Sequence, residues 1–339
     1  MKMMLASNRS VRLGLLWLGC MLAVAVSADR AQAQAGDPAA GYPSKPIRWV
    51  VPSSAGGGND LLARLFGAKI GEHWGQQVVV DLRPGAAGIL GSDIVAKAPP
   101  DGYTILIVAT GYGLNPGLYS SLPYDTLNDF ARVTLLAFAP NVLVVHPSLP
   151  VKSVKQLIAL AKARPGVLNY GSSGAGTGGH LSIELLKHMA GIDMVHVPYK
   201  GAGNATAAVV SGQVDMLMTS PGAALPFIMA GRLRALAVGS ATRVSALPDV
   251  PTVAEAALPG YEVNGFYGVL APGKTPAAIV EKLNGEFQRI LKLPDVRKQL
   301  EARGFDPVGY PPDKFTDYVK HELQKWPPVF RAAGIKLNN

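Results

Sequence analysis

The sequence predicts an α/β protein with two lobes. From Gly41 onward, short apolar runs alternate with helical patterns almost without interruption, which is typical of sheets covered by helices. The chain has 339 residues, and this length favours two lobes of about 100 to 150 residues each over a single core. Two glycine-rich loops, one early in the chain and one near its middle, further suggest two lobes that face one ligand.

Nine apolar runs are predicted to be strands, because they are rich in β-branched residues and are separated by turn signals and helical patterns. Since strands alternate with helices, we expect the sheets to be largely parallel. The predicted strands are residues 47–51, 78–82, 104–109, 141–146, 168–170, 194–199, 216–219, 233–238 and 267–271.

The helices between the strands show start and stop signals. Ser153 and Gln156 have the spacing of an N-terminal capping box. The last helical pattern, over residues 312–334, contains Pro327 and Pro328. Because proline lacks a backbone donor, we expect this helix to kink or restart there.

Residues 1–35 are predicted to be a cleaved secretory signal peptide. Basic residues precede an apolar run over residues 13–26, and small residues over 31–35 fit a cleavage site whose exact position is left open. The apolar run is too short to span a bilayer comfortably, so cleavage is preferred to a membrane anchor. The mature chain is therefore expected outside the cytoplasm.

The composition fits a packed globular protein and not a nucleic-acid binder. Apolar residues make up 48% of the chain and charged residues 16%. The formal net charge is +9, and removal of residues 1–35 lowers it to +6, because four positive residues and one negative residue are lost. Lysine and arginine are scattered without interleaved aromatic residues, so no nucleic-acid partner is expected.

The single cysteine, Cys20, lies inside the apolar run of the predicted signal peptide. Lipid attachment at Cys20 is an alternative to cleavage, but residues 17–19 fit that pattern poorly. With Cys20 removed, the mature chain has no thiol. This excludes disulfides, cysteine–zinc sites and cysteine nucleophiles.

The segment 168–190 indicates a short strand, a glycine-rich loop and a helix. The first N–H groups of a helix lack partners within it, and the helix dipole favours an anion there. Residues 47–65 repeat this order, with a Ser/Gly loop over 53–58 and with Asn59 or Asp60 as a helix cap. The two loops together predict a site that holds a small carboxylate.

The second loop also matches the dinucleotide-binding pattern G-x-G-x-x-G, over residues 174–179. The next predicted strand ends in Tyr199 and Lys200, where an acidic residue would bind the ribose, so an anion or carboxylate is preferred to a nucleotide. The sequence contains neither a Walker-type phosphate motif nor a G-x-S-x-G motif. The six histidines show no metal-binding spacing, so neither a metal nor a cofactor is expected.

Two residues beside the loops have two interpretations each. A helix N-cap explains Asp60 as well as contact with a ligand amino or hydroxyl group does. Capping also explains His180 as well as ligand contact does. No second acid is spaced to pair with Asp60, and no nucleophile–base signature occurs, so the chain is interpreted as a binding protein and not as an enzyme.

Ten motifs occur in order after the predicted signal peptide. They are residues 47–64, VVVDLRPGAAGILG at 78–91, AKAPPDGYTILI at 96–107, NVLVVHPSLPVKSV at 141–154, LNYGSSGAGTGGHL at 168–181, MVHVPYKG at 194–201, GQVDM at 212–216, LRALAVGS at 233–240, LPDVPTVAEA at 247–256 and GVLAPGKTP at 268–276. This set of motifs resembles the tripartite tricarboxylate transporter substrate-binding family, also called TctC or Bug.

The resemblance implies a two-lobed α/β periplasmic-binding-protein fold of type II, the Venus-flytrap fold, with two crossing strands as its hinge. The chain would leave lobe 1 near Leu143 and return near Asn264, so that lobe 1 is residues 42–143 plus 264–339 and lobe 2 is residues 144–263. It also implies a monomeric periplasmic receptor that captures a small carboxylate and delivers it to membrane transporter subunits. The ligand-binding component of a membrane sensor is the alternative, and the identity of the carboxylate is left open.

The resemblance further implies that the ligand is held largely by backbone N–H groups and water. One carboxylate is expected to be held by Ser172, Ser173, Gly174 and Thr177. Closure from the other lobe, directly or through water, is expected from Gly56, Gly57 and Asn59. Packing at the hinge explains Tyr199 and Phe266 as well as ligand contact does. Ser53 stands where members commonly carry Phe or Tyr, so a roomier or more polar wall is expected there. The predicted ligand-binding residues are Ser54, Gly56, Gly57, Asn59, Asp60, Ala87, Gly88, Thr110, Asn115, Ser172, Ser173, Gly174, Thr177, His180, Tyr199, Lys200, Ser220 and Phe266.

Overall fold

The computed structural model describes residues 37–332. Residues 37–42 belong to a short N-terminal unit, and a separate compact unit that begins at Pro43 contains all the strands and helices named below. The predicted signal peptide, residues 1–35, lies outside the described residues, so its cleavage stays a prediction.

The compact unit contains two sheets, and the first has six strands. These strands are β1 (Ile47–Val51), β2 (Val78–Leu82), β3 (Thr104–Ala109), β4 (Phe130–Phe138), β10 (Phe266–Pro272) and β11 (Asp306–Tyr310). Their order across the sheet is β11-β4-β10-β3-β1-β2. β1 pairs in parallel with β2 and β3, while β10 is antiparallel to both β3 and β4.

The second sheet has five strands. They are β5 (Val142–Val145), β6 (Asn169–Ser172), β7 (Val195–Pro198), β8 (Met216–Thr219) and β9 (Arg234–Val238). Their order is β7-β6-β8-β5-β9. β6 is parallel to β7 and β8, and β5 is antiparallel to β8 and β9.

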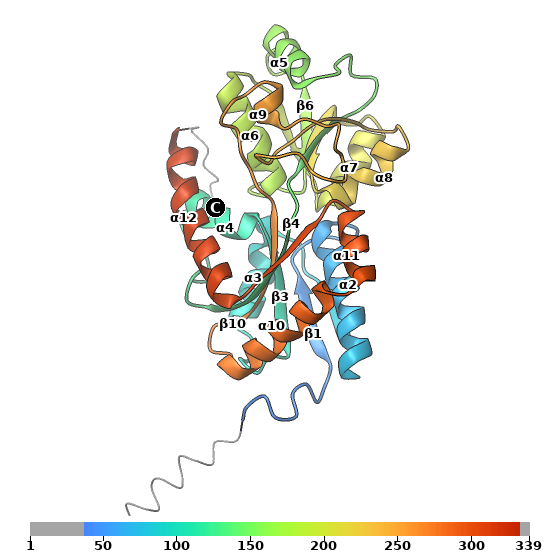
Figure 1. The fold of residues 1–339 in the computed structure, drawn as a ribbon. Coiled ribbons are helices and arrows are strands. Elements are labelled where there is room, and N and C mark those ends of the chain that lie inside the picture. The colour runs from blue at the N-terminus through green and yellow to red at the C-terminus, as the bar shows by residue number, and fades with distance from the viewer. Residues whose placement is uncertain (1–36, 333–339) are drawn as a thin grey trace, which may run out of the picture. The chain divides into compact units, whose positions relative to one another are not determined.

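Two segments of chain connect the sheets and pair with each other. Residues 139–141 link β4 to β5, and residues 239–265 link β9 to β10 (Figure 1). The backbone N–H of Ala139 donates a hydrogen bond to the carbonyl of Gly265 at 2.8 Å. The chain therefore crosses between the sheets twice, as the family resemblance implies, while the exact lobe boundaries stay a prediction.

The expectation of largely parallel sheets is wrong. Of the strand pairings described, four are parallel and five are antiparallel. Parallel neighbours need a crossover connection, usually a helix that packs on the sheet. The chain instead reaches β5 and β10 directly from the crossings, so these strands enter their sheets in the opposite direction.

All nine predicted strands are present, with small differences at their ends. The strands β4 and β11 are not among those predicted. β4 contains Arg132, a buried charged residue whose guanidinium donates to the carbonyls of Leu127 and Phe130. β11 contains Pro307 and Gly309 and lies at the edge of its sheet, which is where proline is tolerated in a strand.

Helices surround both sheets (Figure 1). Those beside the first sheet are α2 (Gly58–Trp74), the short 3₁₀ helix η1 (Ala86–Gly88), α3 (Ile89–Ala96), α4 (Gly111–Leu118), α10 (Ala277–Leu291), α11 (Pro294–Glu301) and α12 (Pro312–Ala332). Those beside the second are α5 (Val154–Ala163), α6 (Gly178–Ala190), α7 (Ala202–Val210), α8 (Pro221–Met229) and α9 (Val253–Ala256). Within residues 37–332, no helix has the length and apolar character needed to cross a membrane.

Both faces of the first sheet are buried, because successive side chains of a strand point in opposite directions. In β1, Val50 belongs to a cluster that includes Leu106 and Phe315. Its neighbour Trp49 contacts Phe287 of α10 edge to face on the other side, with ring centroids 5.4 Å apart. The apolar run of β1 is therefore explained by burial on both faces.

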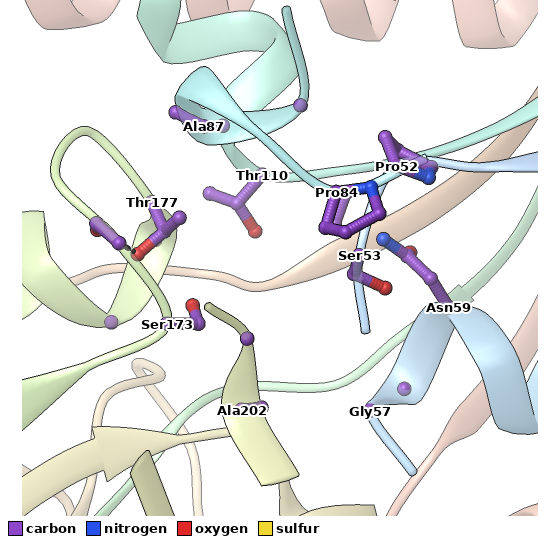
Figure 2. A pocket seen from close by; sticks show the side chains of 18 of the residues that line it. Pro52, Ser53, Gly57, Asn59, Pro84, Ala87, Thr110, Ser173, Thr177 and Ala202 are labelled. Atoms are coloured by element: carbon purple, nitrogen blue, oxygen red, sulfur yellow. Dashed lines mark hydrogen bonds between the residues drawn. The ribbon is translucent and has the colours of Figure 1, made fainter. Parts of the chain in front are cut away.

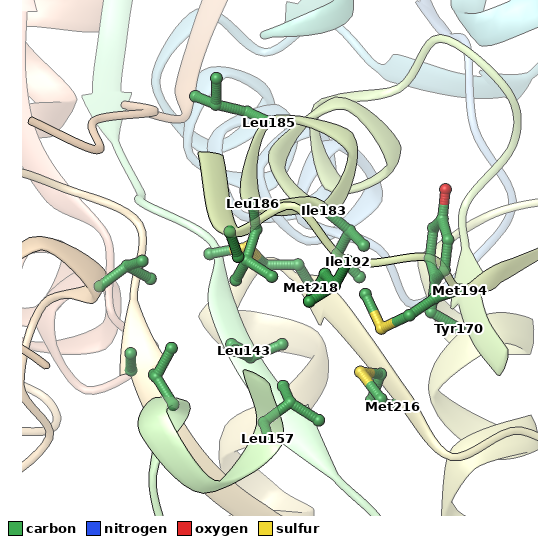
Figure 3. Packing of buried hydrophobic residues seen from close by; sticks show 14 of the residues in the cluster. Leu143, Leu157, Tyr170, Ile183, Leu185, Leu186, Ile192, Met194, Met216 and Met218 are labelled. Atoms are coloured by element: carbon green, nitrogen blue, oxygen red, sulfur yellow. The ribbon is translucent and has the colours of Figure 1, made fainter. Parts of the chain in front are cut away.

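The second sheet is buried in the same way. Figure 3 shows Leu143 of β5 and Met218 of β8 in one cluster with Leu157 of α5 and Ile183 of α6. Leu217, next to Met218, belongs instead to the opposite cluster with residues of α7 and α8. This packing fixes the orientation of α6 and α7, whose first residues reach the site described below.

Helix α12 continues through Pro327 and Pro328, so the helix does not restart there. Trp326 and Phe330 flank the two prolines, are buried and stack with ring centroids 5.6 Å apart. A side chain at Gly117 of α4 would meet Phe330 at 3.0 Å. Close packing on α4 thus offsets the backbone hydrogen bonds that the prolines cannot make.

Candidate ligand-binding site

A cavity of about 600 Å³ lies where loops from the two sheets meet. Its walls are formed by the segments that follow β1, β2 and β3 in the first sheet and β6, β7 and β8 in the second. Figure 2 shows Ser53, Asn59 and Thr110 facing the same space as Ser173 and Thr177. The cavity thus lies at the carboxyl ends of the parallel strands, where α/β sheets usually bind ligands.

Six α-helices begin at this cavity, and in each case the N-cap residue lines it. None of the six has a side-chain hydrogen bond at its N-cap. No N-cap side chain therefore occupies the first N–H groups of these helices, although the N–H of Ile89 in α3 donates to the carbonyl of Ala86. The helix dipoles make the cavity attractive to an anion. The helices and their N-caps are α2 with Gly57, α3 with Gly88, α4 with Thr110, α6 with Thr177, α7 with Gly201 and α8 with Ser220.

The charges of the cavity wall also favour an anion. Among the described residues that line it, Lys200 is the single charged one, and no aspartate or glutamate is present. Lys200 is exposed and follows β7 immediately before the loop that starts α7. An anion in the cavity would therefore meet no opposing carboxylate.

Two side chains of the first sheet's loops offer hydrogen-bond donors to the cavity. Thr110 accepts a hydrogen bond from the backbone N–H of Phe266 at 3.2 Å, so its hydroxyl proton is left for a ligand. Asn59 is 9% exposed, its side-chain oxygen has no partner, and Figure 2 shows its amide directed toward the cavity. The Thr110 hydroxyl and the NH₂ group of Asn59 suit a ligand that accepts hydrogen bonds, whereas the unpartnered Asn59 oxygen would accept one.

The glycine loop of the second sheet is held in shape by its own contacts. The Thr177 hydroxyl donates to the carbonyl of Gly174 at 2.7 Å. The N–H of Gly201 donates to the carbonyl of Ser173 at 3.2 Å, which ties the loop to the start of α7. The Ser173 hydroxyl forms no hydrogen bond within residues 37–332 and lies at the cavity.

The structure brings twelve of the predicted residues together around the cavity. They come from six separate segments, so the two glycine loops do meet across one space. These twelve are Gly57, Asn59, Ala87, Gly88, Thr110, Asn115, Ser173, Gly174, Thr177, Tyr199, Lys200 and Ser220. The other six, Ser54, Gly56, Asp60, Ser172, His180 and Phe266, do not line it.

The three residues of the first loop that do not line the cavity have structural roles. Asp60 accepts hydrogen bonds from the backbone N–H of Gly56 at 2.9 Å and from Arg64 at 2.8 Å. It therefore shapes the start of α2 and does not line the cavity. Gly56 has φ +80° at the tip of the loop. The Ser54 side chain packs against Gly201.

Ser172 and His180 lie behind the second loop. The Ser172 hydroxyl accepts from the N–H of Gly174 at 3.1 Å and lies 2.7 Å from Nε2 of His196. His180 accepts from the N–H of Gly176 at 3.2 Å through Nδ1. Because these polar atoms bond to the loop's own backbone, both residues support the loop from behind.

Phe266 points away from the cavity, whereas its neighbour Tyr267 lines it. Neighbouring side chains of a strand face opposite sides, and Phe266 packs on Phe315 and Tyr318 in the first sheet's core. A side chain at Gly58 would meet the hydroxyl of Tyr267 at 2.3 Å, so glycine is needed there. Burial raises the pKa of Tyr267 to about 12, so the phenol stays neutral.

Several lining residues are not among those predicted, including Pro52, Val108, Ala109, Asn141 and Met218. Most of them stand within a few residues of the carboxyl end of a strand or at a crossing between the sheets. Position after a strand is therefore the signal that would have found them, and it is independent of the glycine-rich motifs. Within residues 37–332, no three His, Cys, Asp or Glu side chains are grouped to hold a metal ion.

The protein has two sheets covered by helices, two crossings between the sheets, and a cavity lined by helix N-termini. This arrangement defines a two-lobed ligand-binding protein. A family model described as "Tripartite tricarboxylate transporter family receptor" matches residues 62–335. The chain belongs to this family. The resemblance seen in the sequence motifs is thus confirmed, and because the family consists of receptors, the protein binds a solute and is not an enzyme.

Two curated relatives match almost the whole chain. The "UPF0065 protein in tcbD-tcbE intergenic region" of Pseudomonas sp. (strain P51) is 43% identical over 321 residues, which covers 94% of each chain. Protein BugT of Bordetella pertussis is 36% identical over 298 residues, which covers 87% of this chain and 91% of BugT.

Two solved structures share the fold. R. palustris Rpa4515 with adipate gives a TM-score of 0.85 at 39% identity, covering 88% of this chain and 100% of the other. MatC (Rpa3494) from Rhodopseudomonas palustris with bound malate gives a TM-score of 0.81 at 33% identity, covering 85% of this chain and 99% of the other. The agreement confirms the predicted two-lobed α/β fold.

Proposed function

We propose that this chain is an extracytoplasmic receptor that captures a small carboxylate in the cavity. The observation that carries the proposal is the convergence of six uncapped helix N-termini on a wall whose single charged residue is Lys200. Backbone N–H groups and helix dipoles stabilise an anion without a paired cation. A volume of about 600 Å³ is in the usual range for small-molecule sites.

The ligands of the solved relatives support a carboxylate. Rpa4515 carries adipate and MatC carries malate, and both proteins share the fold over most of this chain. In this chain, Asn59 and Thr110 would donate hydrogen bonds from the first lobe. The Ser173 hydroxyl and the N–H groups at the start of α6 would donate from the second, and Lys200 would supply a positive charge.

The proposal extends to location and transport. Residues 1–35 would direct the chain to the periplasm, where it would act as a monomer. Lobe 1, residues 42–143 plus 264–339, and lobe 2, residues 144–263, would close on the ligand by hinge motion at the two crossings. The closed receptor would then present the acid to the membrane subunits of a tripartite transporter.

Mass spectrometry tests the ligand class. The protein is expressed in the periplasm and denatured, and the small molecules that it releases are identified. A released acid that raises Tm when added back supports the proposal, because a species that binds only the native state stabilises it. A panel of mono-, di- and tricarboxylates that includes adipate and malate covers the case in which nothing is released. The carboxylate assignment is overturned when no acid is released and none of the panel raises Tm.

Asn59→Leu locates the site within the cavity. This change removes the amide with little loss of volume, and since the amide oxygen has no protein partner, the stability of the ligand-free protein should be kept. Loss of one hydrogen bond to a charged group should weaken binding about tenfold. Asn128→Leu is the matched control, because Asn128 is exposed, bonds to Asp125 and does not line the cavity. Equal affinities for the two variants would place the ligand elsewhere.

Co-purification from membranes tests the partner. The ligand-loaded receptor, carrying an affinity tag, should retain transporter subunits after mild cross-linking, and the ligand-free receptor should retain fewer. Recovery of a sensor protein in their place would replace delivery by signalling while leaving the binding function intact.

A further inference from the structure

Two histidines form a stacked pair directly behind the glycine loop of the second sheet. The rings of His180, at the start of α6, and His196, on β7, have centroids 4.1 Å apart and an interplanar angle of 27°. Tyr170 of β6 extends the stack, with its ring centroid 4.9 Å from that of His196. Three elements that meet at the loop are therefore joined by one column of rings.

Each imidazole is hydrogen-bonded to the loop. His180 Nδ1 lies 3.2 Å from the N–H of Gly176, and an N–H can donate only to a ring nitrogen that carries no proton. His196 Nε2 lies 2.7 Å from the Ser172 hydroxyl, which also accepts from the N–H of Gly174. The backbone at Gly174 and Gly176 is thus fixed by two imidazoles, of which His180 must be neutral.

A proton on either ring would disturb this arrangement. A proton on Nδ1 of His180 would face the N–H of Gly176 and remove the acceptor. Two charged rings at a centroid distance of 4.1 Å would repel each other strongly in a partly buried site. The loop that these contacts shape carries Ser173 and Gly174, which line the cavity.

The surroundings of the pair favour the neutral rings. Among the described residues, the charged groups that bear on them are Glu184 and Lys187 of α6, joined by an ion pair of 2.8 Å. From β6, Tyr170 donates a short hydrogen bond to Glu184 and stays protonated. Burial lowers the pKa of His180, and burial with the adjacent His180 lowers the pKa of His196 to about 4.

We propose that His180 and His196 are positioning residues that hold the glycine loop in its ligand-binding shape while both are neutral, and that proton uptake by the pair releases the ligand. The proposal rests on the proposed function for its ligand and adds to it an acid-sensitive control of affinity. Neither ring lines the cavity, so both act through the backbone of residues 172–177.

Isosteric variants separate the hydrogen bonds from the titration. In His180→Asn, the amide oxygen takes the place of Nδ1 as an acceptor, and in His196→Gln, the amide takes the place of Nε2; neither amide titrates. The double variant H180N/H196Q should therefore bind adipate, the probe, at pH 7.5 with nearly wild-type affinity. His180→Leu has no acceptor, and its affinity should fall about tenfold at the same pH.

The readout is the affinity for adipate between pH 7.5 and pH 3.5. Wild type should lose at least tenfold more affinity over this range than H180N/H196Q, whose residual loss reports titration of adipate itself. His146→Gln is the control, because His146 bonds to Ser148 and does not line the cavity. It should keep the wild-type profile. Equal pH profiles for wild type and the double variant would overturn the proposal.

A second measurement separates this proposal from the carboxylate assignment. The amide NMR signals of Gly174 and Gly176 in the ligand-free protein should move with pH in wild type and stay fixed in H180N/H196Q. This measurement tests whether the two histidines control the loop, even when adipate does not bind. If the two signals are unaffected by pH in wild type, the histidines do not control the loop.

Discussion

Thr110 accepts a hydrogen bond from the backbone N–H of Phe266 at 3.2 Å, and this contact joins the end of β3 to the start of β10. The main-chain pairing of these strands stops with Tyr267 opposite Ala109, so the side chain of Thr110 adds one more link beyond the ladder. The link lies where the chain returns from the second crossing. One hydroxyl therefore both anchors the returning strand and faces the cavity.

Thr110→Val should lower both stability and ligand affinity. Valine has the shape of threonine but leaves the buried N–H of Phe266 without an acceptor, which should cost about 1–3 kcal/mol of unfolding free energy. It also removes the donor that faces the ligand. Thr110→Ser keeps the hydroxyl and should restore most of both quantities in urea unfolding and calorimetric titration. A valine variant with wild-type stability would show that the Phe266 bond contributes little.

Much of the fold is predictable from the sequence, because apolar runs that end at turn-forming residues define most strands. β1, β2, β3 and β8 have the predicted bounds, and each is followed directly by a loop that reaches the cavity. The direction of the strands is not predictable in the same way. It depends on the crossing at residues 139–141, where β4 leads into β5 of the other sheet without a helix between them.

The site is predictable to the level of the loop and not of the residue. Ser172 and Ser173 are adjacent hydroxyls, but Ser172 turns toward His196 while Ser173 lines the cavity. Phe266 and Tyr267 divide in the same way, because strand side chains alternate between faces. Which neighbour faces the ligand is decided by strand register and by partners distant in sequence.

Gly179 should not tolerate a side chain. A Cβ there would lie 2.1 Å from the backbone carbonyl oxygen of Met218 in β8, and backbone cannot move aside as a flexible side chain can. Gly179→Ala should therefore destabilise the fold by about 1–3 kcal/mol and weaken ligand binding. Gly285→Ala is the matched control: Gly285 lies inside α10 with no atom near its Cβ position, so alanine should stabilise by about 0.5–1 kcal/mol. In thermal unfolding, Gly179→Ala should have a lower Tm than the wild type, and Gly285→Ala a higher one.

Glu322 should make the protein less stable as the pH rises. Its side chain accepts a hydrogen bond from Trp326 at 2.7 Å, and burial raises the pKa of this carboxyl. The folded state then binds the proton more tightly than the unfolded state, so the contribution is full below the unfolded pKa of about 4.5 and is lost as pH rises through the folded value. Glu322→Gln keeps an acceptor for Trp326 and should raise Tm at pH 7.5 with little effect at pH 4.

Glu255→Gln provides the contrast for that measurement. The backbone N–H of Thr252 and the Arg243 guanidinium lower the pKa of Glu255, which is the opposite direction. The Gln variant at this position should leave Tm at pH 7.5 unchanged or slightly lower. A rise in Tm of the same size in both variants would point to a general charge effect and not to the buried carboxyl of Glu322.

Ser173→Ala and Thr177→Ala should separate ligand contact from loop structure. The Ser173 hydroxyl lies at the cavity without a hydrogen bond in the described chain, so its loss should weaken carboxylate binding about tenfold and leave the ligand-free Tm unchanged. The Thr177 hydroxyl donates to the carbonyl of Gly174 at 2.7 Å, so its loss should cost about 0.5–1.5 kcal/mol of stability as well. Paired thermal unfolding and titration calorimetry measure both quantities. A drop in ligand-free Tm for Ser173→Ala equal to that for Thr177→Ala would mean that Ser173 also supports the loop, and its assignment as a ligand donor would then fail.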